Sequence, residues 1–131
     1  MSNKPTFITI NKDGMKYGFH GHYIKEENGA YSWYIPAFDI YFSSPNFEEG
    51  DRRAVIMVKS FMNFWIKQQG FRGFVLQILK LGFKAQDDKA LQQLLNRKNI
   101  DAKLRAVGKS IPAEFLDSKI SSQEGELAMA V

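Results

Sequence analysis

Apolar and polar residues alternate along the first third of the chain, a pattern that predicts β-strands with one buried face. The alternating segments are residues 7–11, 15–25, 31–35 and 38–43. Asn28-Gly29 separates the second segment from the third and suits a two-residue type I′ hairpin turn, because both residues tolerate positive φ. We therefore expect an antiparallel sheet of three or four strands.

After residue 46 the apolar spacing changes to three and four residues, which predicts one long helix. Asn46 stands three residues before Glu49, the spacing of an N-cap, and acidic residues fill the first turn. This helix is expected to cover the sheet with one apolar stripe. The stripe comprises Ala54, Val55, Val58, Phe61, Met62 and Trp65.

Met57 and Phe64 lie outside that stripe, on a second side of the same helix. They are seven positions apart, so at about 100° per residue they stack on each other, roughly 90° from the centre of the stripe. Exposed apolar patches favour association, and two-fold dimers are the commonest closed assembly. We expect a homodimer or larger even oligomer with Met57 or Phe64 in or beside the interface, and an oligomeric structural protein is one functional alternative.

The second half of the chain is interrupted by Gly70 and resumes helical spacing at residues 74–79. Gly82 can end this segment in the left-handed conformation, and Asp87 can cap a further helix that ends near Asn99. Residues 101–107 and 124–131 alternate in the manner of strands.

The fold class that follows is α+β: an antiparallel sheet of three to four strands, packed by one long helix, with a small helical C-terminal extension. Residues 1–69 form the sheet-and-helix core. Residues 70–131 form a basic helical extension of the same domain.

Composition narrows the functional classes. A chain of 131 residues with 44% hydrophobic residues fits one globular domain with a real core. The absence of cysteine excludes disulfides, thiol catalysis and thiolate zinc sites, and favours the cytoplasm. No stretch approaches the roughly 20 apolar residues that span a bilayer, and the first ten residues lack the apolar core of a signal peptide. We expect a cytoplasmic protein that does not enter a membrane.

The net charge of +4 is unevenly distributed. Residues 67–109 carry ten Lys and Arg against three Asp, and such a basic block is typical of a surface that attracts nucleic acid or an acidic partner. A solvated lysine-rich face is the competing interpretation. The candidate nucleic-acid-binding residues are Arg97, Lys98, Lys103 and Arg105.

His20 and His22 are the two histidines of the chain. In a strand they share a face and lie roughly 7 Å apart, a spacing that fits two ligands of one metal. A metal site needs further ligands, and carboxylates such as Glu26 or Asp39 would have to supply them. A small metal-dependent hydrolase or nuclease using His20 and His22 is therefore an alternative. We expect instead that both are polar residues on the solvent face, and that the protein has no metal, no cofactor and no catalytic residue.

A Gly-containing turn leads into an aromatic strand, with Gly29, Tyr31, Trp33, Pro36 and Phe38 as its marked positions. The helix that follows has an acidic start, with Glu48, Glu49 and then Ala54. In these positions residues 17–65 resemble the HicB-like fold family, the antitoxin half of bacterial toxin–antitoxin modules.

The resemblance implies a degenerate ribonuclease-H-like sheet without catalytic carboxylates, and a toxin-like protein partner. Together with the basic block, it leads us to expect a non-catalytic binding protein, antitoxin-like or regulatory, that contacts a protein partner or nucleic acid.

Overall fold

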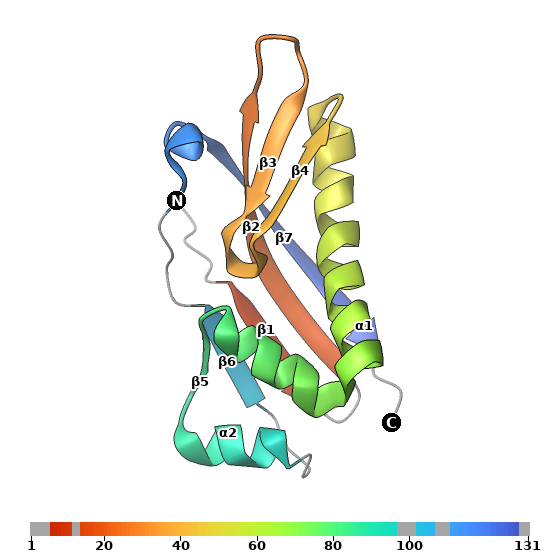
Figure 1. Cartoon of the computed structure of the whole chain (residues 1–131), viewed down its shortest axis with the longest axis vertical. Helices are drawn as coiled ribbons and strands as arrows, with labels where there is room; N and C mark the ends of the chain where they lie inside the picture. Colours follow the sequence, from red (N-terminus) through yellow and green to blue (C-terminus); the bar gives the residue numbers. More distant parts are fainter. Residues whose placement is uncertain (1–5, 12–13, 97–101, 107–110, 129–131) are drawn as a thin grey trace.

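The structure is a computed structural model and describes residues 6–11, 14–96, 102–106 and 111–128. It is an α+β fold in which a curled antiparallel sheet is packed by one long helix (Figure 1). In chain order the elements are β1 (Phe7–Asn11), β2 (Gly14–Lys25), β3 (Tyr31–Ile35), the 3-10 helix η1 (Pro36–Phe38), β4 (Ile40–Ser44), α1 (Phe47–Lys80), β5 (Phe83–Ala85), α2 (Asp88–Leu95), β6 (Ala102–Ala106), the 3-10 helix η2 (Ala113–Phe115) and β7 (Lys119–Ala128).

The long strand β2 organises the sheet. β7 pairs with β2 from Gly14 to Tyr23 along one edge. Two strands pair along the opposite edge of β2, one after the other: β1 pairs with residues 14–18 and β3 pairs with residues 22–25. Beyond these, β6 and β5 extend the β1 side, and β4 extends the β3 side. The sheet therefore forks around residues 19–21 into two halves that share β2 and β7.

Helix α1 covers the inner face of both halves because it bends at Gly70. That residue has φ 73° and ψ 177° inside the helical span, and positive φ is readily available to glycine alone. The first limb runs along the half that contains β3 and β4, and the second limb crosses the half that contains β1 and β6 (Figure 1). The bend confirms the interruption predicted at Gly70.

The core lies between α1 and the sheet. Side chains from the first limb, the second limb and the strands are fully buried together. The largest of them include Tyr17, Phe19, Ile35, Met62, Phe74, Ile78 and Leu104. The predicted caps are also present: Asn46 Oδ1 accepts from the Glu49 N–H at 2.8 Å, and Asp87 Oδ1 accepts from the Ala90 N–H at 2.7 Å.

The sheet is larger than the sequence predicted. Within the described residues seven strands form instead of three or four, and residues 70–131 contribute β5, β6 and β7 as well as the second limb of α1 and the short α2. The prediction of a small helical C-terminal extension is therefore wrong, because this part of the chain also supplies three strands to the sheet. The alternation at residues 124–131 indicated only the end of β7, residues 124–128. Within it Gly125 cannot carry an apolar side chain, because a Cβ there would stand 2.5 Å from the Tyr17 hydroxyl.

The turn between β2 and β3 also differs from the prediction. Asp39 is the one non-glycine residue with positive φ in the described part of the chain, so Asn28 does not adopt a type I′ conformation. Instead the Gly29 N–H donates to the Glu26 carbonyl at 3.0 Å, and Gly29 takes φ 87°. Asn28 Oδ1 accepts from the Ala30 N–H at 2.9 Å. The side chain of Asn28 thus stabilises a longer loop.

Candidate nucleic-acid interface

Basic side chains of β2, β5 and β6 gather on the outer face of the sheet, and β1 lies between β2 and β6. In β6, Ala102 and Leu104 are buried against the core, so the alternate residues Lys103 and Arg105 point to the other side of the sheet. Lys103 is half-buried and Arg105 is exposed.

Cross-strand pairing extends this outer surface over the neighbouring strands. Directly paired residues of antiparallel strands share a face. Arg105 pairs with Lys84 of β5 on one side and with Phe7 of β1 on the other. In the next row, Lys103 pairs with Thr9, and Thr9 pairs with Lys16 of β2. We call this surface the basic face; it comprises Lys16, Lys84, Lys103 and Arg105, with Phe7 and Thr9 between them.

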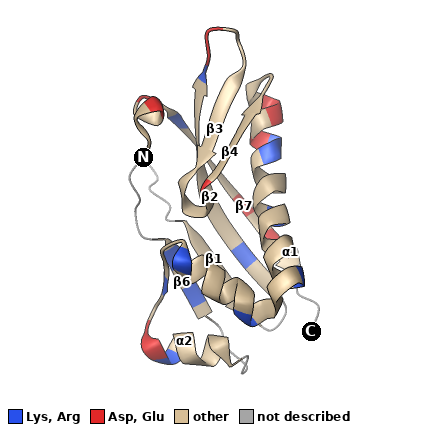
Figure 2. Cartoon of the chain, in the orientation of Figure 1, with Lys and Arg blue, Asp and Glu red and all other residues tan. Residues whose placement is uncertain are grey.

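The basic face spans four strands. At about 4.8 Å between neighbouring strands, the backbones of β5 and β2 are about 14 Å apart. Such a separation allows several phosphate groups of one nucleic-acid strand to be contacted together. Figure 2 marks the positions of basic residues along β2 and β6 and along the second limb of α1 in this half of the molecule.

Phe7 supplies an aromatic ring within the basic face. The ring is half-buried and lies across Gly18 of β2, where an added Cβ would stand 2.6 Å from a ring carbon. Lys103 Nζ lies 5.5 Å from the ring centroid, within cation–π range. A shallow cavity of about 280 Å³ adjoins the ring, between Gly18, His20, Ser122 and Glu124. The ring and cavity together form a place where a planar group can rest.

Acidic residues border the basic face on β7. Lys16 Nζ lies 3.8 Å from Glu126 Oε1, and both side chains are exposed. Exposed ion pairs of this kind contribute at most about 1 kcal/mol, so Lys16 keeps most of its capacity to attract an anion. No ion pair joins Lys84, Lys103 or Arg105 to an acid within the described ranges.

The structure brings together half of the predicted nucleic-acid-binding residues. Lys103 and Arg105 share the basic face, whereas Arg97 and Lys98 lie outside the described residues. Lys16 and Lys84 were missed by the sequence reasoning. The alternation of residues 101–107 placed Lys103 and Arg105 on one side of a strand, but no sequence signal indicated which strands would lie beside it.

His20 and His22 occupy different environments, contrary to the prediction that both face solvent. His22 is 7% exposed, and its Nδ1 lies 3.0 Å from Ser118 Oγ in the segment that follows η2. Burial lowers the pKa of His22 below its usual 6.5, and the charge of nearby His20 lowers it further. The Nδ1 atom of His20 lies 2.8 Å from Ser122 Oγ. No group of three or more His, Cys, Asp or Glu that could hold a metal occurs among the described residues.

Met57 and Phe64 lie on the surface of α1 with exposed fractions of 37% and 55%. Their exposure agrees with the second apolar side expected from the sequence. The C-terminal strand β7 does not lie on that side, because Asp51 of α1 accepts a hydrogen bond from Ser121 of β7 on the opposite flank.

Comparison with known proteins gave no match: no family model matches the chain, and no curated protein or solved structure is significantly similar to it. Within the described residues, no helix is both long and apolar enough to cross a membrane.

Proposed function

We propose that this protein is a non-catalytic binding protein that contacts nucleic acid through the basic face. The observation that carries the proposal is the strand register, which aligns Lys84 with Arg105 and Lys103 with Thr9 and Lys16 on one side of the sheet. Lys and Arg side chains neutralise phosphates and release counterions, which is the main source of affinity in sequence-independent binding.

A single strand is the ligand that this surface fits best. The strands present a broad face rather than a helix that could enter a major groove. Phe7 lies among the cations, and aromatic rings on sheets stack on unpaired bases with about 1–3 kcal/mol per base. A duplex keeps its bases stacked inside, so it would contact the cations without using the ring.

The test is fluorescence anisotropy with a labelled single-stranded oligonucleotide, as DNA and as RNA, over a range of salt concentrations. Four cations predict that log K falls with log salt with a slope of about −3, at about 0.7 per phosphate contact. The double variant Lys103→Ser/Arg105→Ser should bind less tightly to every sequence and reduce the slope by about half. Phe7→Leu keeps an apolar side chain and should weaken single-strand binding more than duplex binding.

The matched control removes the same charge elsewhere. Lys25→Ser/Lys59→Ser changes two exposed lysines, at the end of β2 and on α1, that lie outside the basic face. It should leave the salt slope unchanged. Absence of binding at low salt, or an equal loss in the control, would show that the basic face is only a solvated surface.

A second candidate function is antitoxin-like binding of a toxin-like protein. It is supported by the resemblance of residues 17–65 to the HicB-like family, whose hairpin, third strand and long helix occur in the same order here. The test is co-expression with the product of the neighbouring gene, if that gene encodes a small basic protein. Relief of growth arrest and co-purification of the two chains would favour this function, and failure of both would remove it.

A further inference from the structure

Strand β4 ends one side of the sheet, and β3 is its pairing partner within the described residues. Unpaired strand edges attract further strands, and proteins usually protect them with charged residues or proline. The other terminal strands follow this practice: β5 carries Lys84, and β7 carries Lys119, Glu124 and Glu126. The sequence of β4 is IYFSS, without a charge or a proline.

An apolar flank of α1 lies beside this edge. Arg53 Nη1 donates to the carbonyl of Ser43 in β4 at 2.9 Å, and the rings of Phe61 and Phe38 lie 5.4 Å apart at the β3–β4 connection. Met57 stands midway between Arg53 and Phe61, four residues from each, so it occupies the same flank of the helix. Phe64 follows on this flank beyond the end of the hairpin.

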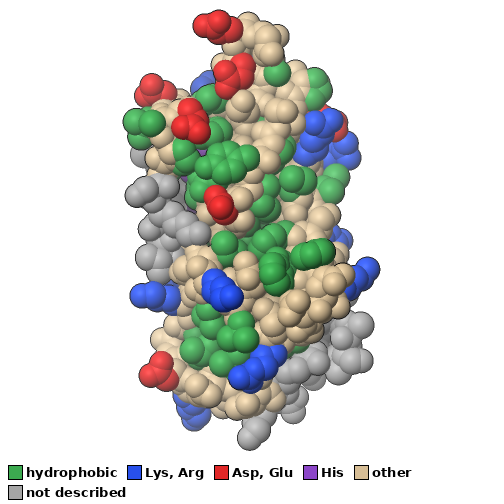
Figure 3. Space-filling model, viewed as in Figure 1, with side chains coloured by type: hydrophobic (Ala, Val, Ile, Leu, Met, Phe, Trp, Pro, Cys, Tyr) green, Lys and Arg blue, Asp and Glu red, His purple; other side chains and the backbone are tan. Residues whose placement is uncertain are grey.

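Further apolar surface surrounds the edge. Tyr41 of β4 is 53% exposed on the other face of the sheet. Figure 3 shows apolar side chains gathered over the β3–β4 hairpin and beside α1 on this side of the molecule. Burial of such side chains against a partner would stabilise association.

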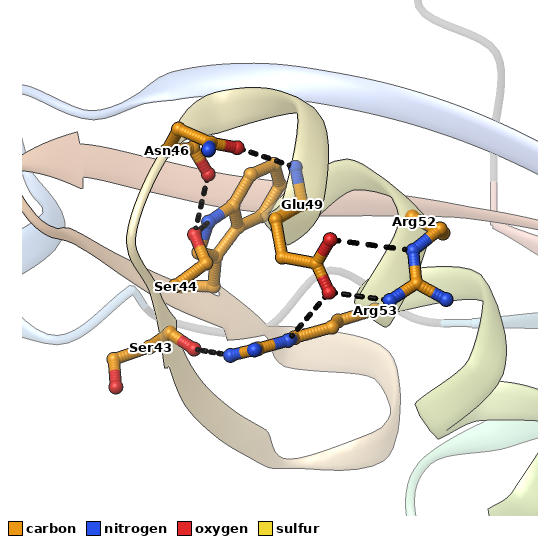
Figure 4. Close-up of polar contacts among 7 residues, drawn as sticks. Ser43, Ser44, Asn46, Glu49, Arg52 and Arg53 are labelled. Carbon is orange, nitrogen blue, oxygen red and sulfur yellow. Dashed lines mark hydrogen bonds and ion pairs between the residues drawn. The ribbon is translucent and has the colours of Figure 1, made fainter.

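The charges at the two ends of the edge are complementary to each other. Arg53 lies at the Ser43 end, where Glu49 is shared between Arg52 and Arg53, so the group retains one positive charge (Figure 4). Asp39 is exposed at the other end, immediately before Ile40. An edge with a cation at one end and an anion at the other complements an antiparallel copy of itself.

We infer that two copies of this chain associate through antiparallel pairing of their β4 strands. A two-fold axis near Phe42 places Ser43 opposite the partner's Tyr41, and brings Arg53 of each copy toward the partner's Asp39. Met57 of both copies then lies near the centre of the interface, with Phe64 at its rim. The Ser43 carbonyl has two lone pairs, so it can accept from Arg53 and from a paired strand.

Multi-angle light scattering at micromolar concentration tests this inference. The wild-type protein should have twice the 15.0 kDa mass of one chain. Met57→Lys should raise the dimer dissociation constant by about 100-fold or more, because it introduces a charge into a dry contact. The matched control is Ile56→Lys, because Ile56 is 46% exposed against 37% for Met57. It is the adjacent residue but lies on another side of α1, so this variant should leave the dimer intact.

A charge exchange separates a direct contact from a loss of folding. Asp39→Arg and Arg53→Asp should each weaken the dimer, and the double variant should recover it, since it restores both ion pairs with reversed sign. A wild-type monomer at micromolar concentration would overturn the inference. A dimer that survives Met57→Lys, or single variants that the exchange does not rescue, would place the interface elsewhere.

Discussion

The two halves of the molecule use the shared strand β2 in different ways. Where β2 pairs with β1, the outer face of the sheet carries the basic face. Where β2 pairs with β3, residues 111–118 lie over the outer face, and the ring of Phe115 is 5.7 Å from that of Tyr34. Figure 2 marks acidic residues at the hairpin loop, at η2 and at the start of α1 in this covered half.

This comparison shows that a strand's pattern does not decide what its outer face does. Lys16 and His22 occupy the same side of β2, six residues apart. Lys16 is exposed beside the basic face, whereas His22 is buried because a later segment of the chain packs on it. Whether the outer face of a strand can bind a ligand therefore depends on whether another segment of the chain covers that face.

The largest expected effect concerns the two faces of β6. Leu104 is fully buried, so Leu104→Ala should lower the free energy of unfolding by about 2–5 kcal/mol. Its neighbour Lys103 points to the basic face, so Lys103→Ala should lower stability by no more than about 1 kcal/mol, through loss of the contact with the Phe7 ring, while weakening nucleic-acid binding. Both variants should be measured by urea unfolding and by fluorescence anisotropy. Equal destabilisation by Lys103→Ala and Leu104→Ala would contradict the assignment of these residues to opposite faces of β6.

An effect of intermediate size concerns His22, in the half of the sheet whose outer face is covered by residues 111–118. Because the pKa of His22 is lowered in the folded state, the unfolded chain binds the proton more tightly. The free energy of unfolding should be greatest above pH 6.5, the ordinary pKa, and should decrease as the pH falls below it. His22→Gln should reduce this loss between about pH 7.5 and about pH 5 in urea titrations.

The neighbouring histidine, His20, which is only half-buried, provides the control for this pH effect. His20→Gln makes the same chemical change on the same side of β2, two residues away and outside the contact with Ser118. It should retain the larger part of the acid-induced loss, which comes from the burial of His22, and remove only the smaller part that the charge of His20 adds. An identical acid-induced loss in wild type and His22→Gln would show that another group is responsible.

The smallest expected effect is at the border of the basic face. Glu126→Gln removes the carboxylate 3.8 Å from Lys16 Nζ, so single-strand affinity should increase, by at most about fivefold for an exposed pair. Glu48→Gln removes an equal charge from the exposed start of α1 and should have no effect on binding. A decrease in affinity with Glu126→Gln would indicate that Glu126 positions Lys16 rather than competing with the ligand.

Local patterns in the sequence predicted much of the fold. The caps at Asn46 and Asp87, the bend at Gly70 and the strand character of residues 102–106 depend on residues within a few positions of each other, which a sequence displays directly. The large sheet was not predicted because its pairings join β1 with β6 and β2 with β7, over distances along the chain that leave no local signal.

The candidate site was only partly predictable for the same reason. Lys103 and Arg105 were identified from the basic block, but Lys16 lies far away in a region of balanced charge and joins them only through the strand register. The burial of His22 was equally hidden, since Ser118 reaches it from 96 residues away. Residues that come together across the sheet are distant in the sequence, so no sequence motif contains them all.

The pairing of β2 with β7 also governs when the protein can fold. Gly14 pairs with Ala128, so one whole edge of the organising strand has no partner until nearly all of the chain described here has been synthesised. Contacts between residues so distant in sequence close long loops and slow folding. During translation the unpaired edge of β2 would remain open to strands of other chains, so the nascent protein is exposed to aggregation for longer than its small size suggests.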